Sequence, residues 1–274
     1  ILKELEEQLP GRVKLMFRPA EETAEGAKSM IAHGLLEDPD VDAAFAMHVM
    51  PTVSRGRVEY TRGVASAAMD VFFIDIYGRG THGSMPEQGI DPLAIAAHLH
   101  LMISSLPAKE ASMFDNITCT IGEMGGGTAA NIVPDTAIVR GSIRSFDTKV
   151  RDRFVNRINA LVETLPKSFG GDAAVRWIST PSVTNDDGVV DIAVDALKEI
   201  FGEDRVIDTG NPLTGSEDFS YVAEQVPAMF VMVGTDGPDA YPVHNPNVVI
   251  DESNMAKSSA ALVHVAWRWL EKNA

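Results

Sequence analysis

The alternation of apolar and polar positions near the N-terminus predicts alternating helices and strands. Apolar residues recur on one face of residues 1–9, which predicts a helix, and the apolar run 13–17 before Pro19 predicts a buried strand. Residues 23–36 have a helical pattern, and residues 42–47 form a second apolar run. A strand, a helix and a strand within about thirty-five residues predict a right-handed crossover between two parallel strands.

The pattern changes at about residue 64 and returns to the first style near residue 179. Between these points, strands are predicted at 69–77, 116–121, 137–144 and 173–178, and helices at 91–106 and 148–169. This βαββαβ order is the ferredoxin-like pattern. Beyond it, a helix at 189–201, a strand at 228–233 and a helix at 252–270 are predicted. We therefore predict an α/β fold in which residues 1–65 and 179–274 form one domain, and residues 66–178 are inserted into it.

Composition and charge narrow the range of partners and compartments. The chain has 274 residues and a formal net charge of −16, from 39 acidic and 23 basic residues. Such a surface repels phosphate backbones, so nucleic acid is not expected as a partner. The sequence has no apolar run long enough to span a bilayer and no signal-peptide pattern at its start, so no membrane partner is expected. The single cysteine, Cys119, fits a reducing compartment, and we expect a cytoplasmic protein.

Two acidic residues and a histidine follow the first two predicted strands. Glu21 and Glu22 come just after the strand at 13–17, and His48 ends the strand at 42–47. Ligands of open α/β sheets bind outside the carboxyl ends of the strands, and carboxylates with an imidazole can hold a divalent metal ion. The alternative is structural: acidic residues also suit the start of a helix, and His48 then merely ends a strand. The spacing of these residues alone favours the structural interpretation.

Two further histidines lie in loops that present them to solvent or to a ligand. His244 stands between Pro242 and Pro246, after the strand at 228–233, and it shares the sheet edge of His48 if that strand is parallel to the others. His82 follows the first strand of the inserted domain and has small neighbours that leave its ring accessible. For His244, spacing alone slightly favours a loop residue without a chemical role, and for His82 a surface residue without such a role is an equally good explanation.

Three other polar motifs have mainly structural interpretations. A β-rich run, not a helix, follows the glycine-rich segment 122–127, which argues against a nucleotide-binding loop. Asn131 comes next, and Arg144 lies thirteen residues later, where its guanidinium could clamp a carboxylate, although solvated strand arginines are common. Ser216, followed by two acids, is typical of an N-capped helix start, so a structural cap is predicted there.

Six segments occur in one order along essentially the whole chain, and they carry a family resemblance. They are FRPAEETAEGAKSMI, AMHVMP, GRGTHGSMP, ANIVPDTAIVRGSIRSFD, TGSEDFS and VHNP. Each is modest alone, but the ordered set is specific. Together they resemble the aminoacylase/carboxypeptidase superfamily of two-metal hydrolases, in its branch of hippurate hydrolases and indoleacetyl–amino acid hydrolases. The resemblance favours the functional interpretation of the acids and histidines.

The resemblance implies roles for individual residues. Glu21 is expected to be the general base, and Glu22, His48 and His244 are expected to bind metal. His82 is expected to reach the active site of a partner subunit, with Asn131 and Arg144 holding the carbonyl or carboxylate of the substrate. Two divalent ions are implied. Zinc or manganese is expected first, and cobalt or nickel is compatible, since the mixed donors do not select one metal.

The resemblance also implies the roles of the domains and the reaction. Residues 1–65 and 179–274 are expected to be the catalytic metal-binding domain, and residues 66–178 the lid or dimerisation domain of a homodimer. The expected reaction is hydrolysis of the amide bond of N-acyl amino acids, of hippurate-like or small peptide-like form. The alternatives are a non-catalytic dimerisation module or degenerate family member, and a metal-free hydrolase that uses the Glu21/Glu22 pair.

One family motif does not occur in the sequence. Family members carry, before the region matched here, an Asp-containing strand and a His-Ala-Cys-Gly-His segment that supply further ligands. Here the only cysteine, Cys119, falls in the inserted domain. We therefore expect an N-terminal segment to be missing, and the 274 residues alone to bind metal weakly and to have little or no activity.

Overall fold

The computed structural model describes residues 1–274, and their contacts divide the chain into two compact units. Unit 1 comprises Ile1–Ala67 and Pro181–Ala274, and unit 2 is Ala68–Thr180. Each unit is built around buried apolar clusters of its own. The predicted fold class, an α/β chain that contains a βαββαβ segment, is confirmed. No helix combines the length and the apolar character that a membrane span requires.

Unit 2 has the predicted βαββαβ order. Its main elements are β4 (Ala68–Tyr77), α2 (Pro92–Glu110), β6 (Ile117–Gly126), β8 (Thr136–Ser145), α3 (Thr148–Ser168) and β9 (Asp172–Thr180). The strands form one antiparallel sheet in the order β6-β8-β4-β9. The short strands β5 (Thr81–His82) and β7 (Ile132–Val133) pair with each other, and the 3-10 turn η3 (Pro86–Gln88) follows β5.

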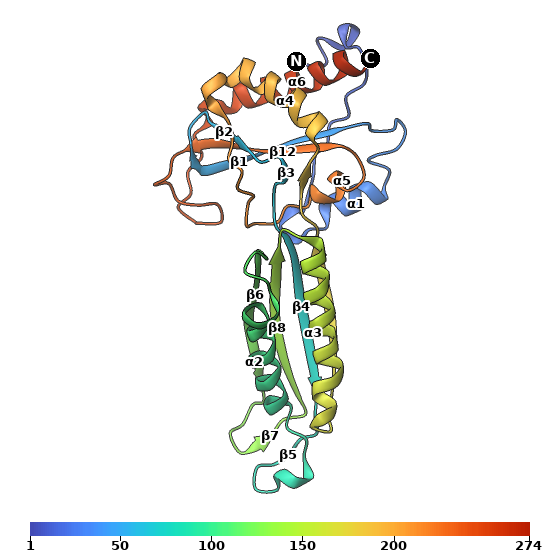
Figure 1. Ribbon diagram of the computed structural model, residues 1–274, viewed down its shortest axis with the longest axis vertical. Coiled ribbons are helices and arrows are strands. Elements are labelled where there is room, and N and C mark those ends of the chain that lie inside the picture. Colours follow the sequence, from blue (N-terminus) through green and yellow to red (C-terminus); the bar gives the residue numbers. More distant parts are fainter. The chain divides into compact units, whose positions relative to one another are not determined.

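Alternation along β4 explains how unit 2 packs. Phe72, Ile74 and Ile76 point to one face of the sheet and are fully buried, and α2 and α3 cover this face (Figure 1). The buried Asp70 lies on the same strand. Arg151 of α3 donates to its two carboxylate oxygens over 2.6 and 2.7 Å, so the charge is paired inside the unit.

Unit 1 is a mixed sheet between two layers of helices. Its strands are β1 (Ala44–Ser54), β2 (Val58–Tyr60), β11 (Val206–Asp208) and β12 (Ala228–Asp236), in the order β1-β12-β2-β11, with β3 (Gly63–Val64) pairing β10 (Thr184–Asn185) separately. Its helices are α1 (Gly26–Ala32), α4 (Asp187–Phe201), α5 (Ser220–Ala223) and α6 (Met255–Asn273). The 3-10 turns are η1 (Glu6–Gln8), η2 (Glu21–Thr23), η4 (Glu203–Arg205) and η5 (Glu252–Asn254).

The central strand β12 is buried on both faces. Met229, Val231 and Val233 belong to the cluster with α4 and α6, while Phe230 and Met232 belong to the cluster with α1 and α5. Figure 1 shows these two helix pairs on opposite sides of the sheet. A strand covered on both faces is apolar throughout, which explains the continuous hydrophobic run at 228–233.

The predicted strand at 13–17 is not formed, and the predicted βαβ crossover is therefore wrong. Residues 13–17 belong to no ladder, and Leu15 and Phe17 are 61% and 82% exposed. The apolar run is present, but a strand exists only where a neighbouring strand accepts its hydrogen bonds. Instead, Lys14 Nζ donates to the carbonyls of Leu35, Glu37 and Pro39, which fixes this segment beside the loop after α1.

Three smaller expectations also differ from the structure. The predicted helix at 1–9 is reduced to turns that include η1, and the helix expected at 23–36 spans only α1. Ala20 and Ala24 adopt left-handed backbone conformations, so a continuous helix cannot start before Glu25. His48 lies inside β1 rather than at its end, because that strand continues to Ser54.

Candidate metal and acid–base site

Glu21 and Glu22 lie in the 3-10 turn η2, between the extended residues 12–19 and α1. Left-handed residues precede and follow this turn, Ala20 with φ 50° and Ala24 with φ 56°. The amide of Ala24 donates to the carbonyl of Glu21 over 2.8 Å and closes the turn. The two adjacent carboxylates of this turn have different neighbours.

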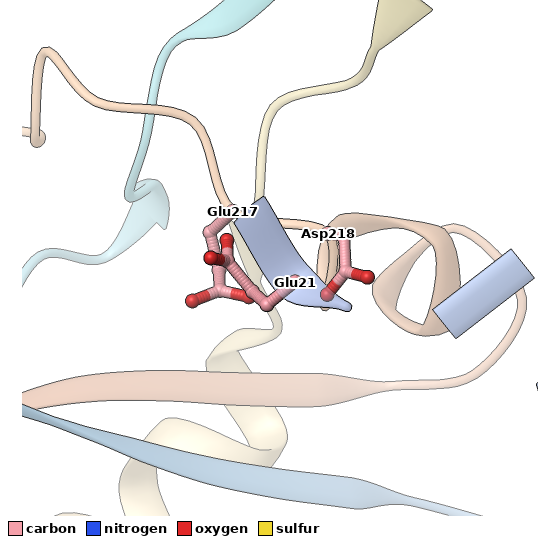
Figure 2. Close-up of side chains that lie close together, drawn as sticks. All are labelled: Glu21, Glu217 and Asp218. Atoms are coloured by element: carbon pink, nitrogen blue, oxygen red, sulfur yellow. The ribbon is translucent and has the colours of Figure 1, made fainter. Parts of the chain in front are cut away.

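Glu21 faces two acidic residues from the segment before α5. Carboxylate oxygens of Glu21, Glu217 and Asp218 lie within 4.8 Å of one another (Figure 2). Glu217 and Asp218 are buried, and the guanidinium of Arg18 stands beside them. Arg18 Nη1 lies 2.5 Å from Glu217 Oε1 and 2.9 Å from Asp218 Oδ1. One cation thus offsets part of the repulsion among three carboxylates.

Glu22 faces His244, which is more than two hundred positions away in the sequence. Glu22 Oε1 lies 3.7 Å from His244 Nδ1, and both side chains are exposed. β12 is parallel to β1, which is the condition under which the loop after it was expected to return to this sheet edge. His244 has a φ of 65°, so its loop turns sharply at the histidine. An oxygen and a nitrogen donor meet here, and this pair fits a divalent metal ion.

Glu21, Glu217 and Asp218 form an acid cluster, and the pKa values of two of its members are raised. The pKa of Glu21 is raised, first by burial and then by the negative charges of Glu217 and Glu22, while Arg18 opposes the shift. The pKa of Asp218 is also raised by burial, against the lowering effects of the Ala27 amide and Arg18. A carboxylate with a raised pKa holds a proton more readily, which is what a general base requires.

His48 is oriented by the strand that carries it. Its Nδ1 lies 2.6 Å from the carbonyl of Val49, and its ring lies 6.4 Å from that of Phe230, between ring centroids. A carbonyl only accepts, so Nδ1 carries the proton in the neutral ring and Nε2 keeps its lone pair. This arrangement is typical of metal-binding histidines. His48 is not a member of the three-carboxylate group, so its role as a ligand stays a prediction.

In unit 2, the structure brings His82 and Asn131 together and separates Arg144 from them. His82 Nδ1 lies 2.8 Å from Ser84 Oγ, and the amide of Gly83 donates to the carbonyl of Asn131 over 2.8 Å. Arg144 lies near the other end of β8, eight residues beyond Thr136. At about 3.3 Å per residue this is roughly 26 Å, so the three side chains do not gather at one place within the unit.

The interpretation of Ser216 as a helix cap is wrong. Helix α5 begins at Ser220, and its N-cap position, Phe219, has no capping side chain. The acceptor is instead Glu217, whose Oε1 receives the amide of Phe219 over 3.1 Å. Sequence reasoning also missed the pairing of Glu217 and Asp218 with Arg18. Their presence in two of the six family segments was the one available signal.

The fold and the site together define a class of protein: a layered α/β domain that carries a cluster of carboxylates and a glutamate–histidine pair, and that has a ferredoxin-like insertion. The chain matches the model of peptidase family M20/M25/M40 over residues 1–268, and it belongs to that family. The predicted resemblance to the two-metal hydrolases of this superfamily is confirmed.

Two relatives are named for the hydrolysis of N-acyl amino acids, and a third protein, with a solved structure, is described as a metal-binding peptidase. The chain is 34% identical to an N-acetyl-L-cysteine deacetylase of Bacillus subtilis over 274 residues, which is all of this chain and 64% of that protein. It is 30% identical to a hippurate hydrolase of Campylobacter jejuni, over 95% of this chain and 68% of the relative. A Bacillus subtilis protein described as a dinuclear metal binding peptidase of the M20 family matches with a TM-score of 0.78 and 28% identity, over 98% of this chain and 68% of that structure. The chain therefore spans about two thirds of the length of these relatives.

Proposed function

We propose that this protein hydrolyses the amide bond of N-acyl amino acids with the help of divalent metal ions. The observation that carries the proposal is the approach of Glu22 and His244 to 3.7 Å, next to the acid cluster that contains Glu21. The potential base and one of the two metal donors thus come from the same two-residue motif, and His244 supplies the second donor. The names of the relatives support small N-acyl amino acids as the substrate class.

In the proposed reaction, water adds to the amide carbon and the C–N bond breaks. Glu21 takes the proton of the attacking water and passes it to the leaving amine, so the products are a carboxylic acid and a free amino acid. Glu22, His48 and His244 are the residues proposed to hold metal. When bound, divalent ions supply Lewis-acid chemistry, because they acidify water and polarise the amide carbonyl. Zinc and manganese are proposed first, and cobalt and nickel are compatible.

We also propose that the protein acts as a homodimer through the βαββαβ domain, residues 66–178. The separation of Arg144 from His82 and Asn131 supports this, since one copy of unit 2 cannot bring all three side chains to a small substrate. If Arg144 serves one active site, then His82 and Asn131 are free to serve that of a partner subunit. Residues 1–65 and 179–274 then form the catalytic metal-binding domain.

The test uses the product of the complete reading frame beside the 274-residue chain. Both are stripped with a chelator and reloaded with Mn²⁺ or Zn²⁺, and the release of free amino acid from N-acetyl-L-cysteine and hippurate is measured. We expect metal-dependent release by the reading-frame product and weak or no release by the 274 residues alone. Glu21→Gln should lower kcat by about 10²–10⁴-fold.

The exposed Glu25 next to the turn supplies the matched control, and Glu25→Gln should keep the activity. Turnover that survives chelation would favour a metal-free carboxylate pair. A reading-frame product that binds no metal and releases no amino acid would leave the non-catalytic dimerisation module as the better account.

A further inference from the structure

We propose that Asp218 is a positioning residue that holds both ends of the segment 18–27 and thereby fixes the turn bearing Glu21 and Glu22. Its link to catalysis rests on the function proposed above. We call the two contacts of Asp218 the clamp, and both lie within unit 1. These contacts join the carboxylate of Asp218 to Arg18, three residues before the turn, and to Ala27 in the first turn of α1.

The two oxygens of Asp218 contact opposite ends of this segment. Oδ2 accepts the amide of Ala27, the second residue of α1, over 2.9 Å. Oδ1 lies 2.9 Å from Arg18 Nη1, before the turn. The side chain of Asp218 is completely buried, so water does not replace either contact easily when the carboxylate is removed.

Between these two anchors the backbone is strained and tightly folded. Ala20 and Ala24 both occupy the left-handed region, which disfavours residues with a Cβ. Gly26 packs so closely on Pro19 that a Cβ there would lie 1.7 Å from the Pro19 carbonyl oxygen. Strained turns persist where surrounding contacts over-determine them, and the Asp218 clamp is such a contact.

The two anchors differ in kind, which makes them separable by experiment. The contact with Ala27 is a hydrogen bond to a backbone amide, which a neutral side-chain oxygen also accepts. The contact with Arg18 lacks hydrogen-bond alignment on Nη1 and Oδ1, so it is an attraction between charges. Glu217 shares the same nitrogen of Arg18 at 2.5 Å and keeps part of that attraction when Asp218 is changed.

The experiment is hydrogen–deuterium exchange on the 274-residue chain, with overlapping peptides that cover 18–24 and 25–33. For Asp218→Ala, we expect amide exchange in both peptides to become at least about ten-fold faster, because both anchors are lost. For Asp218→Asn, exchange should accelerate in 18–24 while the amide of Ala27 stays protected. The matched control is Asp186→Ala, which removes an aspartate that accepts the amide of Val189 at the start of α4.

The distribution of the effect decides the outcome. A purely structural role of Asp218 would accelerate exchange across unit 1 without selecting 18–24, and that result overturns the proposal. Unchanged exchange in 18–24 also overturns it, in either Asp218 variant. If Asp218→Ala does not fold, Asp218→Asn carries the test alone, since its selective effect on 18–24 is expected only from a clamp.

The exchange measurement needs neither metal nor substrate, so it is independent of the proposed function. A separate Mn²⁺ titration of the reading-frame product, with and without Asp218→Asn, tests the functional link. If exchange accelerates selectively in 18–24 of Asp218→Asn but the unsubstituted protein binds no Mn²⁺, the clamp is kept and the hydrolase proposal is rejected. Mn²⁺ binding by the unsubstituted protein, with unaltered exchange in 18–24 of the Asp218 variants, would keep the hydrolase proposal and reject the clamp.

Discussion

Glu21 and Glu22 are neighbours in the sequence, but their carboxylates have different surroundings. Glu21 is partly buried among acids that raise its pKa, whereas Glu22 is exposed beside His244. A proton acceptor and a metal donor need these two different environments. The sequence left open whether the pair simply starts a helix. The structure shows a separate 3-10 turn with left-handed flanks, so a helix start does not account for the pair.

The raised pKa of Glu21 predicts a pH-dependent stability difference between the unsubstituted chain and Glu21→Gln. Burial and neighbouring acids penalise the charged form in the folded state, so folding binds protons and stability rises as the pH falls. We expect Glu21→Gln to be the more stable protein at pH 7, by less than about 1 kcal/mol, since solvent screens a partly buried group.

This advantage of Glu21→Gln should shrink as the pH falls through the raised pKa and should vanish below the ordinary value of 4.5. Urea denaturation at several pH values measures it, with Glu25→Gln as the control for the loss of one exposed acidic side chain. A difference that grows towards acid pH would contradict the direction of the shift.

His244 offers a test of the proposed metal donors. We expect His244→Ala in the reading-frame product to weaken Mn²⁺ binding by at least about 100-fold, because a ligand is lost rather than an outer residue that supports one. Isothermal titration calorimetry measures the affinity. His33→Ala is the control, since His33 is bonded to the Ser29 carbonyl within unit 1 and lies outside the proposed ligand set. Equal affinities in both variants would remove His244 from the site.

At the level of single residues, sequence motifs predicted which side chains belong to the candidate site but not which side chains contact one another. Glu22 and His244 were both proposed from local patterns, and the structure brings them together. Asp218 and Glu217 were interpreted as part of a helix start, because a short acidic run before an apolar segment is usually a capping signal. Their burial beside Arg18 depends on a contact across two hundred positions, which no local pattern contains.

Among the elements, local hydrophobic periodicity sufficed for unit 2 and failed for one segment of unit 1. Every predicted helix and strand of unit 2 is present, because strands with one covered face alternate clearly and its helices have aspartate caps. Residues 13–17 have a comparable apolar pattern without a ladder partner. Periodicity reports which face of an element is apolar, but pairing decides whether a strand forms.

The close packing of α1 on the preceding segment predicts that Gly26→Ala is destabilising. The added Cβ would lie 1.7 Å from the Pro19 carbonyl oxygen and 3.3 Å from Asp218 Oδ2, and backbone must shift to make room. We expect a loss of about 1–3 kcal/mol in the free energy of unfolding, as for other overpacked sites. Urea denaturation measures it. Gly237→Ala, whose Cβ meets nothing within 4 Å, should have almost no effect, and equal losses in the two variants would refute the packing argument.

At the scale of the whole molecule, two self-contained units carry different parts of the proposed function. All the proposed metal donors and the proposed base belong to unit 1, and His82, Asn131 and Arg144 belong to unit 2. Helix α2 exposes Leu93, Leu101 and Met102, and the following loop exposes Met113 and Phe114. Exposed apolar side chains on one helix and the loop after it can mark an interaction site, which supports a second copy as the covering surface.

A charge on the exposed side of α2 should disrupt the proposed homodimer. Leu101 is 67% exposed, so Leu101→Glu should leave the fold of unit 2 intact while placing a buried charge in the proposed interface. We expect the reading-frame product to elute at twice its monomer mass in size-exclusion chromatography with light scattering, and the variant to elute as a monomer. Leu262→Glu makes the same change at an exposed position of α6 in unit 1 and should remain dimeric. If both variants stay dimeric, the interface lies elsewhere on the molecule.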